Sequence, residues 1–325
     1  MSELWLAWAA ILGGFVGLIW SADRFVGGSA AIAKNLGVSR LVIGMTIVAL
    51  GTSAPEIVVS ISASLKGSGD LAVGNALGSN LANVGLVLAI TALIAPMPIQ
   101  RHLIVQEIPI LLLVTAAAGA VLFDARISNL EGLFLLGALV PLLFYMTKNR
   151  VEHPEEEEEA DIPNMGNLHA TLWFMVGLCI LVGSSELLVW GAQTVATAFG
   201  VSPLIIGLTV IAVGTSLPEL AASVMSALKG HHEMALGNII GSNIFNILAV
   251  MSLPGLINPP SMEAEVFMRD FAAMSGVTLL LAVAIIVDYR FRGQSHGSAP
   301  SARLGRRIGT LLLAGYVAYY YLLFN

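Results

Sequence analysis

The sequence predicts an all-α polytopic membrane protein whose ten transmembrane helices form two inverted five-helix repeats. Its composition and an internal duplication carry this prediction. Of the 325 residues, 57% are hydrophobic and only 11% are charged, whereas roughly a quarter of a soluble domain is charged. The apolar runs are continuous and lack the alternation of barrel strands, so helices are expected to cross the bilayer. Ten such spans and short loops leave no room for a separate soluble domain.

Each predicted span is an apolar run, and most of the connections between runs carry Gly, Pro or charged residues. A helix needs about 20 apolar residues to cross the hydrocarbon core. The expected spans lie at roughly 4–22, 40–65, 71–95, 103–123, 128–147, 168–190, 203–228, 234–257, 270–288 and 305–323. The longest polar stretch, 148–167, separates the first five spans from the last five.

The two halves of the chain are copies of one repeat. A shift of 163 positions aligns residues 37–90 with residues 200–253, and nearly half of the aligned residues are identical. We therefore predict a first five-helix repeat at 1–147 and a second at 168–325. Because each repeat holds an odd number of spans, the two copies must cross the membrane in opposite directions. Such inverted repeats are typical of secondary transporters, which bind their cargo near the midplane.

The distribution of Lys and Arg predicts the orientation, because cytoplasmic loops carry an excess of both. With the N-terminus outside, all but three of the 15 Lys and Arg residues lie in inner loops. Both termini are then outside, and the acidic loop 148–167 is cytoplasmic. That loop supplies much of the net charge of −6, so the charge does not indicate a basic partner. We expect the lipid bilayer as the surroundings, with no nucleic acid and no obligatory protein partner.

The motif GTSxPE occurs at 51–56, inside a long apolar span. Proline has no N–H, so Pro55 leaves the carbonyl of Gly51 without its helical partner. Helical spacing would place Thr52 and Ser53 on the same side as Glu56. Carboxylate, hydroxyl and carbonyl oxygens are the ligands of hard cations such as Na⁺ and Ca²⁺.

The second copy of this motif, at 214–219, repeats every element. Pro218 frees the carbonyl of Gly214, while Thr215 and Ser216 accompany Glu219. A carboxylate at the bilayer centre costs at least about 2.5 kcal/mol and is a functional hypothesis by default. Two of them at matching points of a duplication point to function rather than to a proline kink with a satisfied glutamate.

The helix after each GTSxPE motif carries a polar stripe, GNALGSNLAN at 74–83 and GNIIGSNIFN at 237–246. Asn75 and Asn238, near the helix start, are explained as well by helix–helix hydrogen bonds as by cation binding. Residues midway along the span lie at the depth of the glutamates and are favoured as ligands. These candidates are Ser79, Asn83, Ser242 and Asn246.

The paired GTSxPE and GNxxGSNxxN segments resemble the alpha-repeats of the sodium/calcium exchanger family, within the cation/Ca²⁺ exchanger superfamily. The chain is similar to short prokaryotic members that lack a large regulatory loop. The resemblance implies that the second, third, seventh and eighth helices surround the cation sites and that the first and sixth slide across them. The ligands that it implies are Ala49 through its carbonyl, Thr52, Ser53, Glu56, Ser79, Asn83, Ala212, Thr215, Ser216, Glu219, Ser242 and Asn246.

The function implied by the resemblance is Na⁺/Ca²⁺ antiport across a prokaryotic inner membrane, without a cofactor and without enzymatic activity. Many family members have aspartate in one repeat where this chain has Asn83 and Asn246. Two carboxylates are then expected at the core, and involvement of K⁺ or H⁺ is left open. The alternatives are an H⁺/Ca²⁺ exchanger that uses the same glutamates and, less favoured, a cation channel.

Overall fold

The structure, a computed structural model, describes residues 2–151, 164–201, 210, 212–292 and 302–324. The chain forms two compact units, and each unit takes segments from both halves of the sequence. Unit 1 comprises Met1–Pro55 and Asn149–Asn238, and unit 2 comprises Glu56–Lys148 and Ile239–Asn325. The predicted division of the chain at the acidic loop 148–167 stays a prediction, and residues 152–163 of this loop lie outside the described residues.

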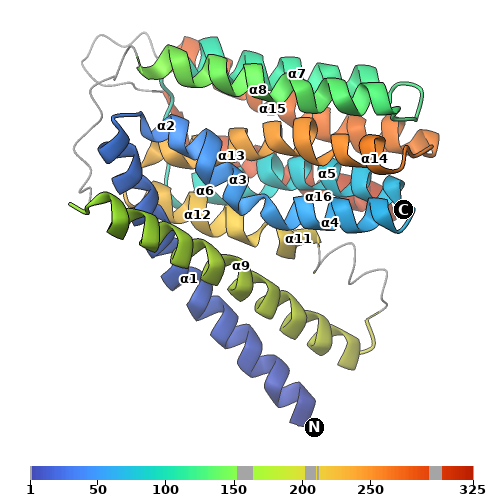
Figure 1. The fold of residues 1–325 in the computed structure, drawn as a ribbon, viewed down its shortest axis with the longest axis horizontal. Coiled ribbons are helices and arrows are strands. Elements are labelled where there is room, and N and C mark those ends of the chain that lie inside the picture. Colours follow the sequence, from blue (N-terminus) through green and yellow to red (C-terminus); the bar gives the residue numbers. More distant parts are fainter. Residues whose placement is uncertain (1, 152–163, 202–209, 211, 293–301, 325) are drawn as a thin grey trace. The chain divides into compact units, whose positions relative to one another are not determined.

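Unit 1 is mainly helical over its described residues (Figure 1). It contains α1 (Ser2–Leu36), α2 (Arg40–Ile43), the π-helix η1 (Gly44–Val48), α3 (Ala49–Thr52), α9 (Asn167–Ala198), α11 (Ala212–Thr215) and α12 (Leu217–Leu228). The boundaries between the units fall within α4 (Ala54–Leu65), near the end of α8 (Asn129–Val151), and within α13 (His232–Phe245).

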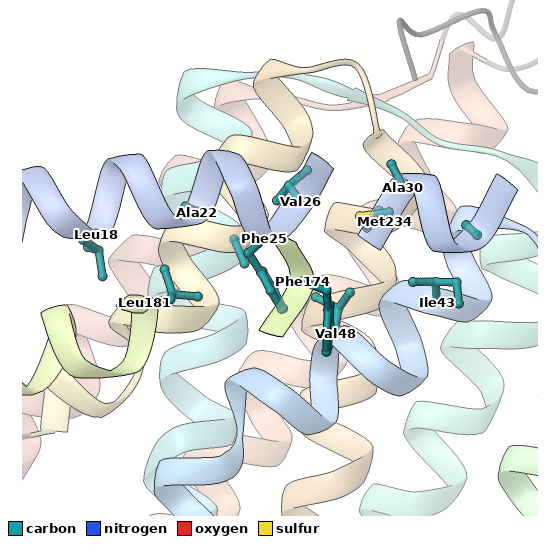
Figure 2. Packing of buried hydrophobic residues seen from close by; sticks show 12 residues of the cluster. Leu18, Ala22, Phe25, Val26, Ala30, Ile43, Val48, Phe174, Leu181 and Met234 are labelled. Atoms are coloured by element: carbon teal, nitrogen blue, oxygen red, sulfur yellow. The ribbon is translucent and has the colours of Figure 1, made fainter. Parts of the chain in front are cut away.

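The two long helices α1 and α9 lie side by side (Figure 1). Glycines allow their backbones to approach closely, as in small-residue interfaces between membrane helices. A Cβ at Gly28 would lie 2.6 Å from the Phe174 nitrogen, and a Cβ at Gly177 would lie 2.6 Å from the Phe25 nitrogen. Beside these contacts, the rings of Phe25 and Phe174 pack 5.1 Å apart in the apolar core of unit 1 (Figure 2).

Both long helices extend beyond the spans that the sequence predicts. The expected span 4–22 ends at the polar segment SADR, whereas α1 continues to Leu36. The polar groups of this segment find partners, so the helix need not end there. Ser21 Oγ donates to the Leu18 carbonyl, and Asp23 Oδ1 lies 2.7 Å from Lys229 Nζ at the end of α12. At 1.5 Å per residue, a helix of 35 residues is about 52 Å long, more than the hydrocarbon core.

Unit 2 is also mainly helical. Besides its parts of α4 and α13 and all but the last turn of α8, it contains α5 (Gly69–Ala82), η2 (Asn83–Leu88), α6 (Ala89–Ile94), β1 (Met97–Pro98), η3 (Leu103–Glu107), α7 (Ile108–Leu122), η5 (Asn246–Val250), α14 (Ser252–Ile257), η6 (Val266–Phe271), α15 (Ala272–Arg292), β2 (Arg303–Leu304) and α16 (Arg306–Phe324). The two short strands pair antiparallel and are the one departure from the all-α prediction among the described residues. Helix α5 contacts η5, α14 and α15, while α16 contacts η2 and α6.

The secondary structure repeats with the sequence. Four elements of the first repeat begin 163 residues before their counterparts in the second. These pairs are α5 with α13, η2 with η5, α6 with α14, and η3 with η6. The opposite orientation of the two copies stays a prediction.

The chain is an integral membrane protein. Seven described helices are long and apolar enough to cross a bilayer, and an eighth span results if the bent pair Arg40–Thr52 and Ala54–Leu65 counts as one. The first part of the predicted span 203–228 lies outside the described residues except for residue 210, and the part from 212 onward contains α11 and α12. The count of ten spans therefore stays a prediction.

The turn between α12 and α13 holds a histidine that is expected to make stability pH-dependent. His231 is buried, and its Nδ1 lies 3.1 Å from Arg40 Nη1. Because a guanidinium can only donate, His231 must be neutral at Nδ1. Burial, together with the charges of Arg40, Lys229 and His232, lowers the pKa of His231 from 6.5 to about 4.

In the unfolded chain the His231 side chain is protonated below about pH 6.5, whereas in the folded chain it is protonated only below about pH 4. Acidification from about pH 7 to about pH 5 is therefore expected to cost up to about 2 kcal/mol of stability through this residue. Thermal unfolding in detergent at both pH values tests this. The His231→Gln variant keeps an acceptor for Arg40 and should lose less stability than the parent; an equal loss in both proteins would contradict the prediction.

Candidate functional site

Both copies of the GTSxPE motif break their helix at the serine. Ser53 has φ −82° and ψ 7°, and Ser216 has φ −89° and ψ 3°, values outside the helical region. In the first repeat the break bends the span by 45°. The cause is the proline two residues later, whose missing N–H removes one helical hydrogen bond. In the second repeat the freed carbonyl of Gly214 accepts a hydrogen bond of 2.9 Å from Ser185 of α9.

Within unit 1, the hydroxyls of the first repeat bond to side chains of the second. Ser53 Oγ donates to Glu219 Oε1 at 3.2 Å, and Thr52 Oγ1 donates to Asn238 Oδ1 at 3.1 Å. All four side chains are fully buried. The break at Ser53 therefore turns both hydroxyls toward the other repeat.

Glu219 keeps one oxygen for a further ligand. Its Oε2 is buried and has no hydrogen-bond partner among the described residues, and the same holds for Ser216 Oγ at the break. Buried polar oxygens without partners are costly in an apolar interior. A cation bound by these oxygens would remove that cost.

The remaining unit 1 candidates are backbone or half-buried groups. The Ala49 carbonyl accepts a hydrogen bond from the Ser53 nitrogen at 3.0 Å. It also lies 3.3 Å from Thr52 Oγ1, so it is an alternative to Asn238 as the acceptor of the single Thr52 proton. Ala212 and Thr215 form the two ends of α11, and Thr215 is half-buried.

In unit 2, Glu56 is fully buried in the first turn of α4. Its backbone carbonyl accepts a hydrogen bond of 3.3 Å from Asn75 Nδ2. In unit 1, Asn238 Nδ2 donates in the same way to the backbone carbonyl of Glu219, at 3.4 Å. The first asparagine of each polar stripe thus holds the backbone of the preceding glutamate.

The polar stripes of α5 and α13 meet within unit 2. Asn80 Nδ2 donates to the backbone carbonyl of Asn243 at 3.2 Å, and these two residues occupy the same position in the two repeats. The neighbouring candidates Ser79 and Ser242 are buried on the same helices.

A π-helix begins at each of the two candidate asparagines. The element η2 begins at Asn83 and η5 begins at Asn246, and both side chains are buried. Neither amide has a hydrogen-bond partner among the described residues, and neither has Ser242 Oγ. Single π turns occur often at functional sites.

These groups suit an alkali or alkaline-earth cation better than a transition metal. The described residues contain no group of three or more His, Cys, Asp or Glu side chains that could hold a metal ion. The candidate ligands instead offer oxygens without partners, from the Glu219 carboxylate, the hydroxyls of Ser216 and Ser242, and the amides of Asn83 and Asn246, and hard cations prefer such oxygens.

Sequence reasoning missed two supporting serines. Ser223, one turn after Glu219, accepts a hydrogen bond of 2.9 Å from Asn238 Nδ2, and Ser185 bonds the Gly214 carbonyl. A signal existed for the first, because Ser60 occupies the same position after Glu56 in the other repeat. Ser185 lies outside the aligned segments 37–90 and 200–253 and had no such signal.

A family profile and individual relatives each match almost the whole chain. A family profile described as sodium/calcium exchanger protein matches residues 6–148 and 169–325. A protein of Alkalimonas amylolytica named as the antiporter CaxA is 45% identical over 321 residues, covering 97% of this chain and 98% of that protein. The inner membrane protein YrbG of Escherichia coli is 37% identical over 327 residues, covering 98% and 97% of the two chains.

A solved structure is similar over almost the whole chain. The sodium-calcium exchanger NCX_Mj, soaked with zero Na⁺ and Ca²⁺, superposes with a TM-score of 0.82 at 32% identity. The match covers 98% of this chain and 99% of that one.

Proposed function

Because this chain belongs to the sodium/calcium exchanger family, whose members carry out cation/Ca²⁺ antiport, we propose that it exchanges Na⁺ for Ca²⁺ through Glu56 and Glu219. One observation carries the assignment of the glutamates. Each is fully buried at the same place in its repeat, three residues after the serine at which the GTSxPE segment leaves the helix.

Charge balance supports exchange of one cargo for the other. Two carboxylates neutralise one Ca²⁺ or two Na⁺, and a third Na⁺ would have to bind neutral oxygens alone. Ca²⁺ and Na⁺ compete for the same carboxylates, so the protein carries one or the other on each crossing. The neutral ligands in this proposal are Ala49, Thr52, Ser53, Ser79, Asn83, Ala212, Thr215, Ser216, Ser242 and Asn246.

The moving part in this proposal is the pair α1 and α9. Glycines such as Gly28 and Gly177 bring the two helices close together, and the pair forms much of unit 1. We place the protein in an inner membrane with both termini outside, as the excess of Lys and Arg in the alternate loops favours. The name of the Escherichia coli relative is consistent with that membrane.

Transport by purified protein in liposomes tests the function. An outward Na⁺ gradient is expected to drive uptake of radiolabelled Ca²⁺, and an ionophore that collapses the gradient should stop it. A pH gradient in Na⁺-free buffer should drive none. Ca²⁺ uptake driven by protons alone would replace this proposal with H⁺/Ca²⁺ exchange, and uptake without any gradient dependence would indicate a channel.

A further inference from the structure

Asn238 lies beside the candidate cation ligands but has all of its hydrogen-bonding groups engaged by the protein. Its Nδ2 donates to Ser223 Oγ at 2.9 Å and to the Glu219 backbone carbonyl at 3.4 Å, and its Oδ1 accepts from Thr52 Oγ1 at 3.1 Å. The side chain is fully buried. Both polar atoms of the Asn238 amide therefore have protein partners, and one of the two lone pairs of Oδ1 is taken by Thr52.

The carbonyl of Glu219 fixes the orientation of the Asn238 amide. A backbone carbonyl can only accept, so the amide nitrogen must face Glu219 and the amide oxygen must face Thr52. Oδ1 has no proton to give, so the hydroxyl of Thr52 has to be the donor in their contact. The equivalent bond from Asn75 to the Glu56 carbonyl shows that this use of the asparagine is common to both repeats.

This polarity matters because a hydroxyl binds a cation through its oxygen. When the proton of Thr52 is directed at Asn238, the lone pairs of Thr52 Oγ1 point elsewhere and are available to a ligand. Without that acceptor, the hydroxyl would turn to the Ala49 carbonyl, which lies 3.3 Å away, or to the Glu219 carboxylate, and both are candidate ligands. One lost acceptor would then weaken two cation ligands.

We propose that Asn238 is a positioning residue that orients the Thr52 hydroxyl for cation binding and keeps the Ala49 carbonyl available. This inference rests on the proposed function, since it assumes that Thr52 and Ala49 bind the transported cation. It assigns to Asn238 a role through Thr52 rather than a direct contact with the ion.

The test is a double-mutant cycle read as apparent Na⁺ affinity. Asn238→Ala is expected to raise the Na⁺ concentration for half-maximal Ca²⁺ uptake about fivefold, the effect of one lost hydrogen bond. Thr52→Val should raise it similarly or more. In the Thr52→Val background, Asn238→Ala should have little further effect, because the hydroxyl that it orients is gone. Equal effects of Asn238→Ala in both backgrounds would overturn the proposal.

A second readout separates this inference from the proposed function. Stabilisation of the purified protein by Na⁺ or Ca²⁺, measured as the shift of Tm, reports binding without transport. Wild-type protein that binds cations but shows no Na⁺-driven uptake would refute the proposed function, and the Tm shift of Asn238→Ala would still decide the role of Asn238. If Na⁺ or Ca²⁺ shifts the Tm of the Asn238→Ala variant as much as that of the wild type, the inference is wrong.

Two further variants address folding and packing. Asn238→Leu keeps the shape of the side chain without its acceptor and serves if Asn238→Ala does not fold; it should show the same weakened Na⁺ binding. Ser223→Ala removes the other partner of Asn238 but leaves the contact with Thr52. It should weaken Na⁺ binding less than Asn238→Ala does, and an equal loss would mean that Asn238 acts only through helix packing.

Discussion

Replacing Glu56 or Glu219 by glutamine is expected to abolish Na⁺-driven Ca²⁺ uptake. Each substitution keeps the size and burial of the side chain but removes one of the two negative charges proposed to balance the cargo. Interactions of charged groups in buried sites are worth roughly 3 kcal/mol, so a loss of about a hundredfold in uptake is expected for either variant. Initial rates of radiolabelled Ca²⁺ uptake in liposomes, normalised to reconstituted protein, measure this.

The control is an exposed glutamate in a membrane helix. Glu186 lies in α9 and has no part in the proposed site. Glu186→Gln is expected to transport at the parental rate, which shows that loss of a carboxylate in a span is not damaging in itself. Parental uptake by both the Glu56→Gln and the Glu219→Gln proteins would refute the proposed mechanism.

The prolines in the sequence indicated where each helix loses a hydrogen bond, although they did not predict a break. Pro55 and Pro218 cannot donate to the carbonyls four residues before them, and the chain leaves the helix at Ser53 and Ser216 as a result. The repeat alignment likewise predicts matched elements, because segments that are nearly half identical fold alike. Local chemistry and self-comparison therefore recovered the backbone of the candidate site.

The partners of the side chains could not be predicted in this way. Helical spacing suggested that Thr52 and Ser53 would face the same side as Glu56, but it assumed a continuous helix. Once the helix breaks at Ser53, the hydroxyls bond to Asn238 and Glu219, more than 160 residues away in the sequence. Which distant group meets a hydroxyl depends on packing between repeats, and no periodicity in one segment encodes it.

The π-helices are a second feature that the pattern did not indicate. A π turn inserts one residue into the helical repeat, and its residues have the same propensities as those of an α-helix. Asn83 and Asn246 mark the first residues of η2 and η5, but an asparagine within a span predicts an interhelical hydrogen bond equally well. The absence of a bonding partner among the described residues distinguishes the two, and only coordinates supply it.

Substituting alanine for Gly237 is expected to destabilise the protein, although alanine normally favours a helix. A Cβ at Gly237 would lie 2.6 Å from the carbonyl oxygen of Leu41 and 3.1 Å from the nitrogen of Met45. Both neighbours are backbone atoms, so the strain cannot be relieved by turning a side chain. We expect a loss of about 1–3 kcal/mol, as for other overpacked sites.

Gly13→Ala is the matched control and is expected to stabilise the protein. Gly13 lies within α1, and no atom of the described residues comes within 4 Å of a Cβ built there. The gain from replacing glycine within a helix, about 0.5–1 kcal/mol, should then appear unopposed. The Tm of each purified variant in detergent gives both signs, and a Gly237→Ala protein as stable as Gly13→Ala would contradict the close approach.

Gly237→Ala is also expected to weaken Na⁺ binding. Gly237 directly precedes Asn238, so a backbone pushed away from Leu41 carries Asn238 away from Thr52. Gly237→Ala protein that remains folded is therefore expected to need more Na⁺ for half-maximal uptake, as Asn238→Ala does. Because Gly13 contacts neither residue, Gly13→Ala should leave this Na⁺ requirement unchanged. A loss of stability without a change in Na⁺ affinity would mean that the position of α13 does not control the orientation of Thr52.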